Sequence, residues 1–241
     1  MTAALRPGFL LGGRVRHDQP ATGHRTGIEP VFLAASIPAR VGERVLEGGT
    51  GSGAALLCLA ARVPGIIGVG IERDAAVADI ATVNIAANGF GGLSIVAADL
   101  ADARLEGTFD HAFANPPWHE PAGTASPDSA REAARRATAG LFETWATHLA
   151  APLRYRGTLT FVVAAAAAPA CLAAFTSAGC GSLAVLPLWP RAATDAKLVL
   201  VRGVKGGRAP FRLLPGMALH EADGHFTAEA DSILRNGAAL P

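Results

Sequence analysis

Cysteine, lysine and tyrosine are scarce in this sequence of 241 residues, and its hydrophobic runs are short. The three cysteines, Cys58, Cys171 and Cys180, form no C-x-x-C pair and lie among small apolar residues. This pattern indicates buried thiols and excludes both a disulfide framework and a cysteine zinc site, so it points to a reducing, cytoplasmic compartment. The seven histidines show no metal-ligand spacing. We therefore expect no metal.

The longest apolar run, residues 159–175, is too short for a membrane span. It falls below the roughly 18 to 20 residues that cross a bilayer, and Pro169 interrupts it. The run instead predicts a buried strand over 159–165 and then a helix that begins near Pro169. The first residues lack the basic start, apolar run and cleavage site of a signal peptide, so we expect none.

The charge is nearly balanced, with a formal net charge of +1. Half of the residues are hydrophobic and 17% are charged, which suffices for a large core and excludes a disordered chain. The segment from Lys197 to Arg212 carries five basic residues and no acid. Such a segment either contacts phosphates or forms a solvated basic hairpin, and the sequence leaves both open.

Strands and helices alternate along most of the chain. The first forty residues are rich in glycine, proline and basic groups, so we expect an irregular or short-strand cap over 1–40 and one domain over 41–241. We expect strands at 45–47, 65–72, 93–97, 109–114, 159–165, 197–204 and 211–219, and helices at 52–62, 74–87, 129–148, after Pro169 and at 228–235. This order predicts an α/β fold with a mostly parallel sheet and helices on both faces. In such sheets ligands bind at the carboxyl ends of the strands.

The first strand runs into the sequence E-G-G-T-G-S-G, residues 47–53. Glycines there allow a sharp turn and a close approach of the backbone to a ligand, and the following helix offers free N–H groups. The second strand ends in Glu72, whose carboxylate can accept hydrogen bonds from both ribose hydroxyls of a nucleoside. Gly49, Gly51 and Ala54 also fit the G-x-G-x-x-A pattern. This loop alone therefore fits a dinucleotide as well as S-adenosylmethionine.

The third and fourth strand ends are more specific. Asp99 and Leu100 follow the third strand and pair a carboxylate with an aliphatic side chain, which suits the amino group and apolar face of an adenine. Asp99 taken alone is equally compatible with an ordinary turn. The fourth strand ends in Asn115-Pro116-Pro117-Trp118, two prolines that stiffen the backbone between an amide and an aromatic ring.

This last motif resembles the N-P-P-(Y/F/W) signature of class I methyltransferases that modify planar amide or exocyclic amino nitrogens. An exocyclic nitrogen is a poor nucleophile because its lone pair is delocalised into the ring. The Asn115 side-chain carbonyl and the Pro116 backbone carbonyl can accept its two N–H groups, and Trp118 can stack on the base. The sulfonium of S-adenosylmethionine already activates the methyl group, so no metal is required. A base within a helix or stacked loop must be flipped out to reach such a site.

From about Gly12 to Leu240 the chain resembles the small methyltransferase-domain family. More narrowly, it is similar to bacterial tRNA methyltransferases that modify N6 of adenine 37 in the valine tRNA anticodon loop. Residues 24–33 (HRTGIEPVFL), the four strand ends and residues 131–135 (REAAR) carry this narrower resemblance. Many relatives have T-D-G where this chain has Ile28-Glu29-Pro30, and they usually have tyrosine in place of Trp118.

The resemblance implies a Rossmann-like class I methyltransferase fold, with a seven-stranded, mostly parallel sheet whose final strand is antiparallel, and with catalysis in residues 41–241. It implies S-adenosylmethionine as cofactor and tRNA as substrate. The implied cofactor residues are Glu29, Glu47, Gly49, Gly51, Gly53, Glu72, Arg73, Asp99 and Leu100.

RNA contacts are inferred from clusters of basic residues, because arginine binds phosphates through its bidentate fork. Asp128 and Glu132 lie near the second cluster, so a salt-bridged helix face is the alternative there. The candidate RNA-binding residues are Arg14, Arg16, His24, Arg25, Arg131, Arg135 and Arg136.

Three alternatives stay open. The same motif can act on protein glutamine, ribosomal RNA guanine or DNA adenine, although the chain offers no room for a helical recognition domain of the glutamine enzymes or for a DNA target-recognition domain. A nicotinamide-dependent oxidoreductase explains the glycines and Glu72, but it leaves Asn115 to Trp118 without a role, and Tyr155 is the only tyrosine. A non-catalytic RNA-binding module has no need of the intact N-P-P sequence.

Overall fold

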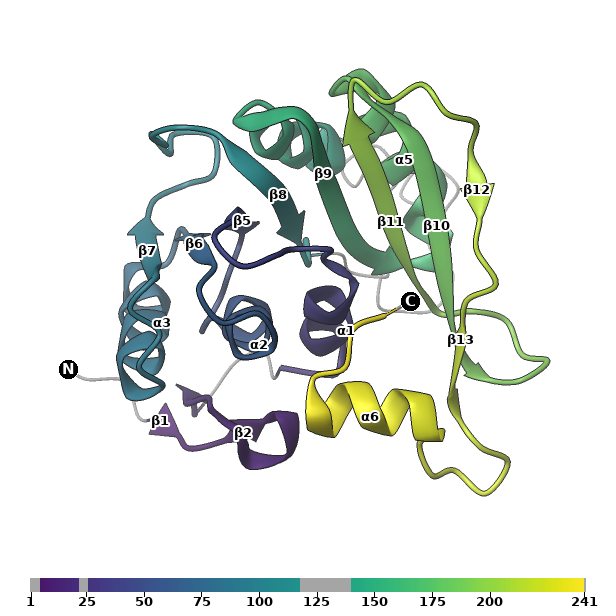
Figure 1. Cartoon of the computed structure of the whole chain (residues 1–241), viewed down its shortest axis with the longest axis horizontal. Coiled ribbons are helices and arrows are strands. Elements are labelled where there is room, and N and C mark those ends of the chain that lie inside the picture. The colour runs from purple at the N-terminus through teal and green to yellow at the C-terminus, as the bar shows by residue number, and fades with distance from the viewer. Residues whose placement is uncertain (1–4, 22–25, 118–139, 241) are drawn as a thin grey trace, which may run out of the picture.

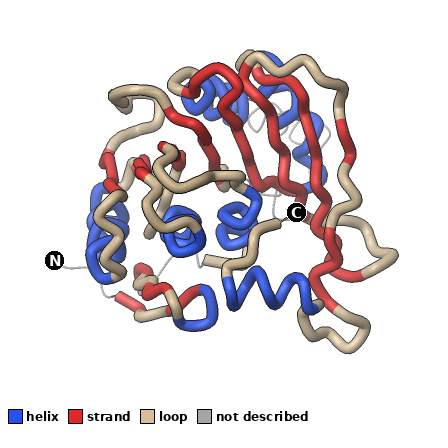
Figure 2. Tube along the Cα trace, viewed as in Figure 1, coloured by secondary structure: helices blue, strands red, loops and turns tan. Residues whose placement is uncertain are grey.

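The computed structural model describes residues 5–21, 26–117 and 140–240, and its centre is one sheet with helices on both faces (Figures 1 and 2). Seven strands form the central part of this sheet. They are β5 (Arg44–Gly48), β6 (Ile67–Glu72), β7 (Leu93–Ala97), β8 (Phe109–Ala114), β9 (Leu153–Ala164), β10 (Cys180–Arg191) and β11 (Leu198–Lys205). Two short strands, β12 (Arg212–Leu213) and β13 (Met217–His220), extend it at one edge.

The strand order is that of a doubly wound sheet with one reversed strand. Across the sheet the order is β12-β10-β11-β9-β8-β5-β6-β7, with β13 also beside β10. The pairs β5–β6, β6–β7, β5–β8 and β8–β9 are parallel, whereas β11 is antiparallel to both β9 and β10. The expected α/β class is confirmed. The seven central strands contain the expected antiparallel member, and the described residues add β12 and β13 beside β10.

The helices cover the sheet because its strands are apolar on both sides. Val45 and Leu46 are adjacent and fully buried, yet they belong to separate clusters on opposite faces. One face packs against α1 (Glu29–Ser36), α2 (Ala54–Arg62), α3 (Ala75–Ala87) and α6 (Ala228–Asn236). The other packs against α5 (Ala168–Ser177) and the helical residues 140–150. Among the described helices, none is long and apolar enough to cross a membrane.

Short strands and one helix make up the N-terminal segment. β1 (Leu5–Arg6) pairs with β4 (Gln19–Pro20), and β2 (Phe9–Leu10) pairs with β3 (Val15–Arg16) around the 3-10 turn η1 (Leu11–Gly13). The short strands agree with the sequence, but α1 was not predicted. It begins at Glu29 and Pro30, which suit a helix start, and its later residues are buried against α2.

Two sequence expectations about the last strands were wrong. β10 was missed because glycine and two prolines interrupt its pattern; Pro187 falls between the residues that pair with β12 and those that pair with β13, so the missing N–H is tolerated there. The expected strand over 211–219 is two strands, because Pro215 and Gly216, the latter at φ +76°, break it. The helix expected over 129–148 lies partly outside the described residues, and 140–150 is helical.

Part of the basic run from Lys197 to Arg212 serves the fold. Arg202 donates to the Ser36 carbonyl, and Arg62 donates to the Ala34 carbonyl at 3.0 Å and to that of Ile37. The two arginines thus satisfy carbonyls at the end of α1, where the helix dipole favours cations. Lys205 Nζ donates to the carbonyls of 151 and 153, each at 2.8 Å. These side chains are structural contacts.

Candidate functional site

A glycine loop, residues 49–53, joins β5 to α2 at the carboxyl edge of the sheet. Gly49, Gly51 and Gly53 have φ values of +62°, +57° and +93°, in the left-handed region that disfavours other residues. The Thr50 N–H donates to the Ile71 carbonyl at 2.9 Å, which ties the loop to the next strand. The alternate glycines are therefore a backbone requirement of the turn, as the sequence indicated.

Glu47 is buried beneath this loop and is 3% exposed. Its Oε2 accepts the Thr50 hydroxyl at 2.6 Å and the Leu56 N–H at 3.1 Å. The pKa of Glu47 is raised to about 8, mainly by burial; the two hydrogen bonds oppose this rise, and the nearby Glu72 charge adds to it. Glu47 thus links the strand, the loop and the first turn of α2.

Glu72 holds the loop from the neighbouring strand. Its Oε2 accepts the Gly51 N–H and its Oε1 accepts the Asp74 N–H, each at 3.0 Å. The side chain is half-buried, and each carboxylate oxygen keeps a lone pair that can accept a further hydrogen bond. In the parallel register Glu72 lies opposite Ala97, which brings the end of β7 beside it.

Asp99 and Leu100 follow β7 in a turn. Asp99 is exposed and its Oδ1 accepts the Ala101 N–H at 2.9 Å, so it caps this turn. Leu100 is 8% exposed and packs beside Gly48. The pair therefore lies at the strand edge next to the end of β5, with the carboxylate toward solvent and the aliphatic group toward the core.

The Asn115 corner begins where β8 ends. Ala114 pairs with Gly48, so Asn115 follows β8 at the same level as the glycine loop follows β5. Asn115 is half-buried, Pro116 is buried and Pro117 is exposed. Trp118 lies outside the described residues.

These features fit the cofactor that the sequence implies. A Cβ on Gly51 would meet no atom within 4 Å, so the surface above this glycine is open. Gly53 is the N-cap of α2 and provides no capping side chain, so Glu47 takes the Leu56 N–H and the first two N–H groups of the helix have no side-chain acceptor among the described residues. Glu72 supplies acceptors for ribose hydroxyls. The donor and acceptor set suits a nucleoside joined to an amino acid.

Trp145 is a site residue that sequence reasoning missed. It lies in the helical segment 140–150, and its ring carbon Cη2 is 2.5 Å from where a Cβ on Gly49 would be. Gly49 therefore has a second constraint besides its φ, a close approach of the indole. Trp145 is three residues after the buried Phe142, within a predicted helix. No signal in the sequence linked that helix to the loop.

The remaining predicted cofactor-binding and RNA-binding residues were not among those placed beside the glycine loop above. The Glu29 carboxylate lies over Gly27 in the first turn of α1, and Arg73 is exposed. Arg14 donates to the carbonyl of residue 236 at 2.6 Å, and Arg16 pairs with Asp18 at 2.9 Å. The predicted residues His24, Arg25, Arg131, Arg135 and Arg136 lie outside the described residues.

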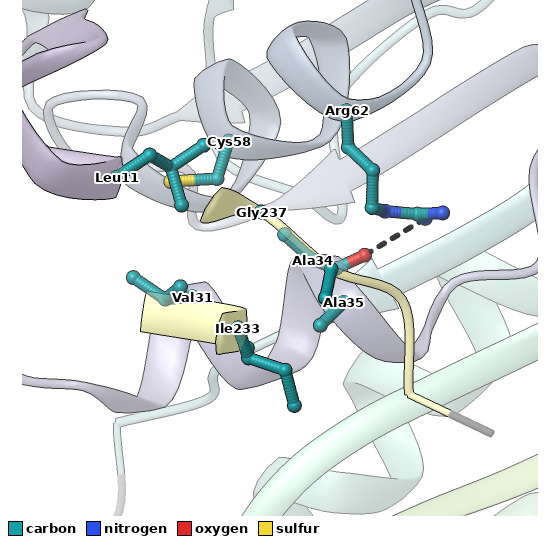
Figure 3. A pocket seen from close by; sticks show the side chains of 9 residues that line it. Leu11, Val31, Ala34, Ala35, Cys58, Arg62, Ile233 and Gly237 are labelled. Carbon is teal, nitrogen blue, oxygen red and sulfur yellow. Dashed lines mark hydrogen bonds between the residues drawn. The ribbon is translucent and has the colours of Figure 1, made fainter. Parts of the chain in front are cut away.

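A separate small hollow lies between α1, α2 and α6 (Figure 3). Aliphatic side chains and Cys58 line it, and the Arg62 guanidinium reaches the Ala34 carbonyl across its rim. Burial raises the pKa of Cys58 to about 12, so this thiol is unreactive. Within the described ranges, no three His, Cys, Asp or Glu side chains form a metal-binding group.

A family model and curated relatives that match this chain are all described as methyltransferases. The family model described as methyltransferase small domain matches residues 28–164. Two curated sequences from strains of Porphyromonas gingivalis, each named tRNA1(Val) (adenine(37)-N6)-methyltransferase, are 34% identical over 132 residues, or 49% of this chain and 50% of theirs. The match thus spans about half the length of these curated relatives.

Solved structures show the same fold. A predicted O-methyltransferase from Agrobacterium tumefaciens superposes with a TM-score of 0.73 at 25% identity, over 88% of this chain and 98% of that one. An S-adenosylmethionine-dependent O-methyltransferase from Thermotoga maritima superposes with a TM-score of 0.55 at 17% identity, over 78% of this chain and 69% of that one.

We expect the raised pKa of Glu47 to make the free energy of unfolding depend on pH. Its pKa is about 8 when folded and near 4.5 when unfolded, so the folded state holds a proton that the unfolded state loses between these values. The contribution of Glu47 to the free energy of unfolding is therefore present below pH 4.5 and lost as pH rises toward 8. Glu47→Gln should become more stable relative to wild type from pH 5 to pH 8, by up to about 4 kcal/mol, measured by urea unfolding. Parallel pH profiles for the two proteins would contradict this assignment.

We expect the added methyl group of Gly49→Ala to clash with the Trp145 ring, whereas that of Gly51→Ala meets no atom within 4 Å. Both residues have left-handed φ, but only the Cβ at 49 meets Trp145. Gly49→Ala should cost about 1–3 kcal/mol more unfolding free energy than Gly51→Ala. Adding Trp145→Ala should recover part of that difference in the first variant and none in the second. Equal costs for the two glycine variants would show that the indole does not constrain the loop.

Proposed function

We propose that this chain, which belongs to the methyltransferase small domain family and is an S-adenosylmethionine-dependent methyltransferase, methylates the exocyclic amino nitrogen of an adenine in tRNA. The relatives from Porphyromonas gingivalis are named for adenine 37 of tRNA1(Val), and we propose the same target here. A tRNA substrate also implies action in the cytoplasm. In this proposal residues 1–40 form the cap and 41–241 the catalytic domain.

One observation supports nitrogen as the methyl acceptor. Asn115-Pro116-Pro117 leaves β8 beside the start of the glycine loop, because Ala114 and Gly48 are paired. The bound cofactor supplies a methyl group on a sulfonium. An amide oxygen and a proline carbonyl at this corner can both accept N–H groups from one flat amino nitrogen. A hydroxyl group as methyl acceptor carries only one proton, so it could donate to only one of these two oxygens.

In the proposed mechanism the chain orients the base and receives no covalent bond. The Asn115 Oδ1 and the Pro116 carbonyl accept the two amino N–H groups, and these hydrogen bonds strengthen as the nitrogen becomes tetrahedral during attack. The prolines limit movement of both acceptors, so little reorganisation is needed. Trp118, after the corner in sequence, is proposed to stack on the flipped adenine.

The cofactor side of the proposal uses the loop and the carboxylates around it. The cofactor residues proposed are Glu29, Glu47, Gly49, Gly51, Gly53, Glu72, Arg73, Asp99 and Leu100. Glu72 accepts the ribose hydroxyls, and Asp99 with Leu100 receives the adenine of the cofactor. Glu47 stays beneath the loop and, once ionised, attracts the cofactor ammonium.

The proposed RNA contacts come from the two basic clusters that the sequence shows. Arg16 is held by Asp18 and Arg14 by the carbonyl of residue 236, so fewer of their N–H groups remain for phosphates. We propose that the principal phosphate contacts come from His24, Arg25, Arg131, Arg135 and Arg136.

Asn115→Ala tests the acceptor role. Removing this carbonyl should lower the methyl-transfer rate by roughly 100-fold or more, because the lost hydrogen bond is strongest in the transition state. Binding of S-adenosylhomocysteine, measured by calorimetry, should change little. Unchanged turnover at saturating tRNA and cofactor would refute the role of Asn115.

The substrate is tested by incubating total tRNA with methyl-labelled cofactor and identifying the labelled nucleoside by mass spectrometry. The proposal expects N6-methyladenosine, and oligonucleotide mapping should place it at position 37 of the valine tRNA. A label on guanine or on ribose oxygen would identify another acceptor and contradict the proposal. Label on ribose would agree instead with the O-methyltransferase names of the structural neighbours.

A further inference from the structure

Residues 15–18 of the N-terminal segment lie along α3 as an extended strap. Asn88 accepts the Arg16 N–H at 2.9 Å and donates to the Arg16 carbonyl at 2.7 Å. Asn84 makes the same two contacts with the Asp18 backbone, each at 2.9 Å. Two residues of extended chain rise about 6.6 Å and four residues of helix about 6 Å, so the two spacings match. The asparagines thus fix both the position and the register of the strap.

This pairing turns the residue between them toward the glycine loop. His17 is 1% exposed, and its Nε2 lies 2.8 Å from the Ser52 Oγ. The remaining N–H of the Asn84 amide donates to the Ser52 carbonyl at 2.9 Å. Ser52 is therefore held by its side chain and by its backbone, from two different parts of the chain. Figure 1 shows the N-terminal strands beside α2 and α3.

The glycine loop needs such contacts because its glycines are flexible. Ser52 lies between Gly51 and Gly53, both in the left-handed region, and fixing glycine costs more conformational entropy than fixing any other residue. Thr50 is held by Glu47 and the Gly51 N–H by Glu72. The strap supplies the anchor of the next residue. With it, three consecutive loop residues each have a hydrogen-bonded partner outside the loop.

Burying His17 costs free energy of folding, because one of its ring nitrogens lacks a hydrogen-bond partner among the described residues. Its Nδ1 is buried and has no hydrogen-bond partner among the described residues. Burial lowers its pKa to about 4, although the neighbouring Asp18 opposes this, so the ring is neutral at neutral pH. A phenylalanine would fill similar space without a buried unpaired nitrogen. The polar ring therefore serves its contact with Ser52.

We propose that His17 and Asn84 are positioning residues for cofactor binding, and that the strap preorganises the glycine loop through Ser52. Both side chains are buried, so in this proposal they act through Ser52 and not by contact with the cofactor. The inference rests on the cofactor site described above and is independent of which nucleic acid is methylated. A loop already held in its binding shape loses less entropy when the cofactor binds, so the strap increases affinity.

The test compares His17→Phe with a matched variant elsewhere. His111 is also buried and its Nδ1 lies 2.8 Å from the Thr158 hydroxyl, but it lies within β8, away from the loop. His17→Phe should weaken binding of S-adenosylhomocysteine about 5-fold, the effect of losing one hydrogen bond, with little change in unfolding temperature or in kcat at saturating cofactor. His111→Phe should lower the unfolding temperature and leave that affinity unchanged.

A cycle with Ser52→Ala shows whether His17 acts through this hydroxyl. The double variant should bind no more weakly than the weaker single variant. His17→Gln, whose amide nitrogen can reach the position of Nε2, should recover most of the affinity. It also serves as the test if the phenylalanine variant fails to fold.

The proposal is overturned if His17→Phe folds and binds S-adenosylhomocysteine as wild type does, or if the two single effects simply add. Failure of the substrate proposal has a different signature. There the wild-type protein binds S-adenosylhomocysteine and responds to His17→Phe, yet leaves tRNA unlabelled.

Discussion

The turn from β5 into α2 is the constraint on which the rest of the site depends. Five residues must reverse direction at the edge of the sheet, and three of them do so at positive φ. Such a turn is costly to order, so buried and half-buried carboxylates hold it on both sides. Glu47 binds the Thr50 hydroxyl and the α2 backbone, while Glu72 binds the Gly51 N–H. Trp145 and the strap at residues 15–18 add contacts from distant parts of the chain.

The sheet order then brings the chemistry to this turn. β5 lies between β6 and β8, so the residues after those strands flank the loop: Glu72 on one side and Asn115 on the other. In the proposed site the cofactor therefore lies toward β6 and β7, and the methyl acceptor lies toward the end of β8. The antiparallel strand β11 pairs with β9 on the far side of β8 from the glycine loop. Arg62 and Arg202 bind carbonyls at the end of α1, which is a structural role.

Local patterns were sufficient for much of this architecture. β7 and β8 have the bounds that their apolar runs predicted, and the positive φ values of the three loop glycines agree with the role inferred for them. Features that depend on distant partners could not be predicted in this way. β10 is stable despite its prolines because β11, β12 and β13 flank it. The link between Asn84 and Asp18 spans 66 positions, and neither residue has a local pattern that indicates it.

We infer that the cofactor binds above the glycine loop, between Glu72 and Asn115. Hydrogen exchange of backbone amides, measured with and without S-adenosylhomocysteine, checks this placement. Exchange should slow in peptides that cover residues 49–56 and 72–77 and in the one that contains Asn115, with little change in α5 and α6. Slower exchange elsewhere, with these three segments unaffected, would show that the cofactor binds at another site.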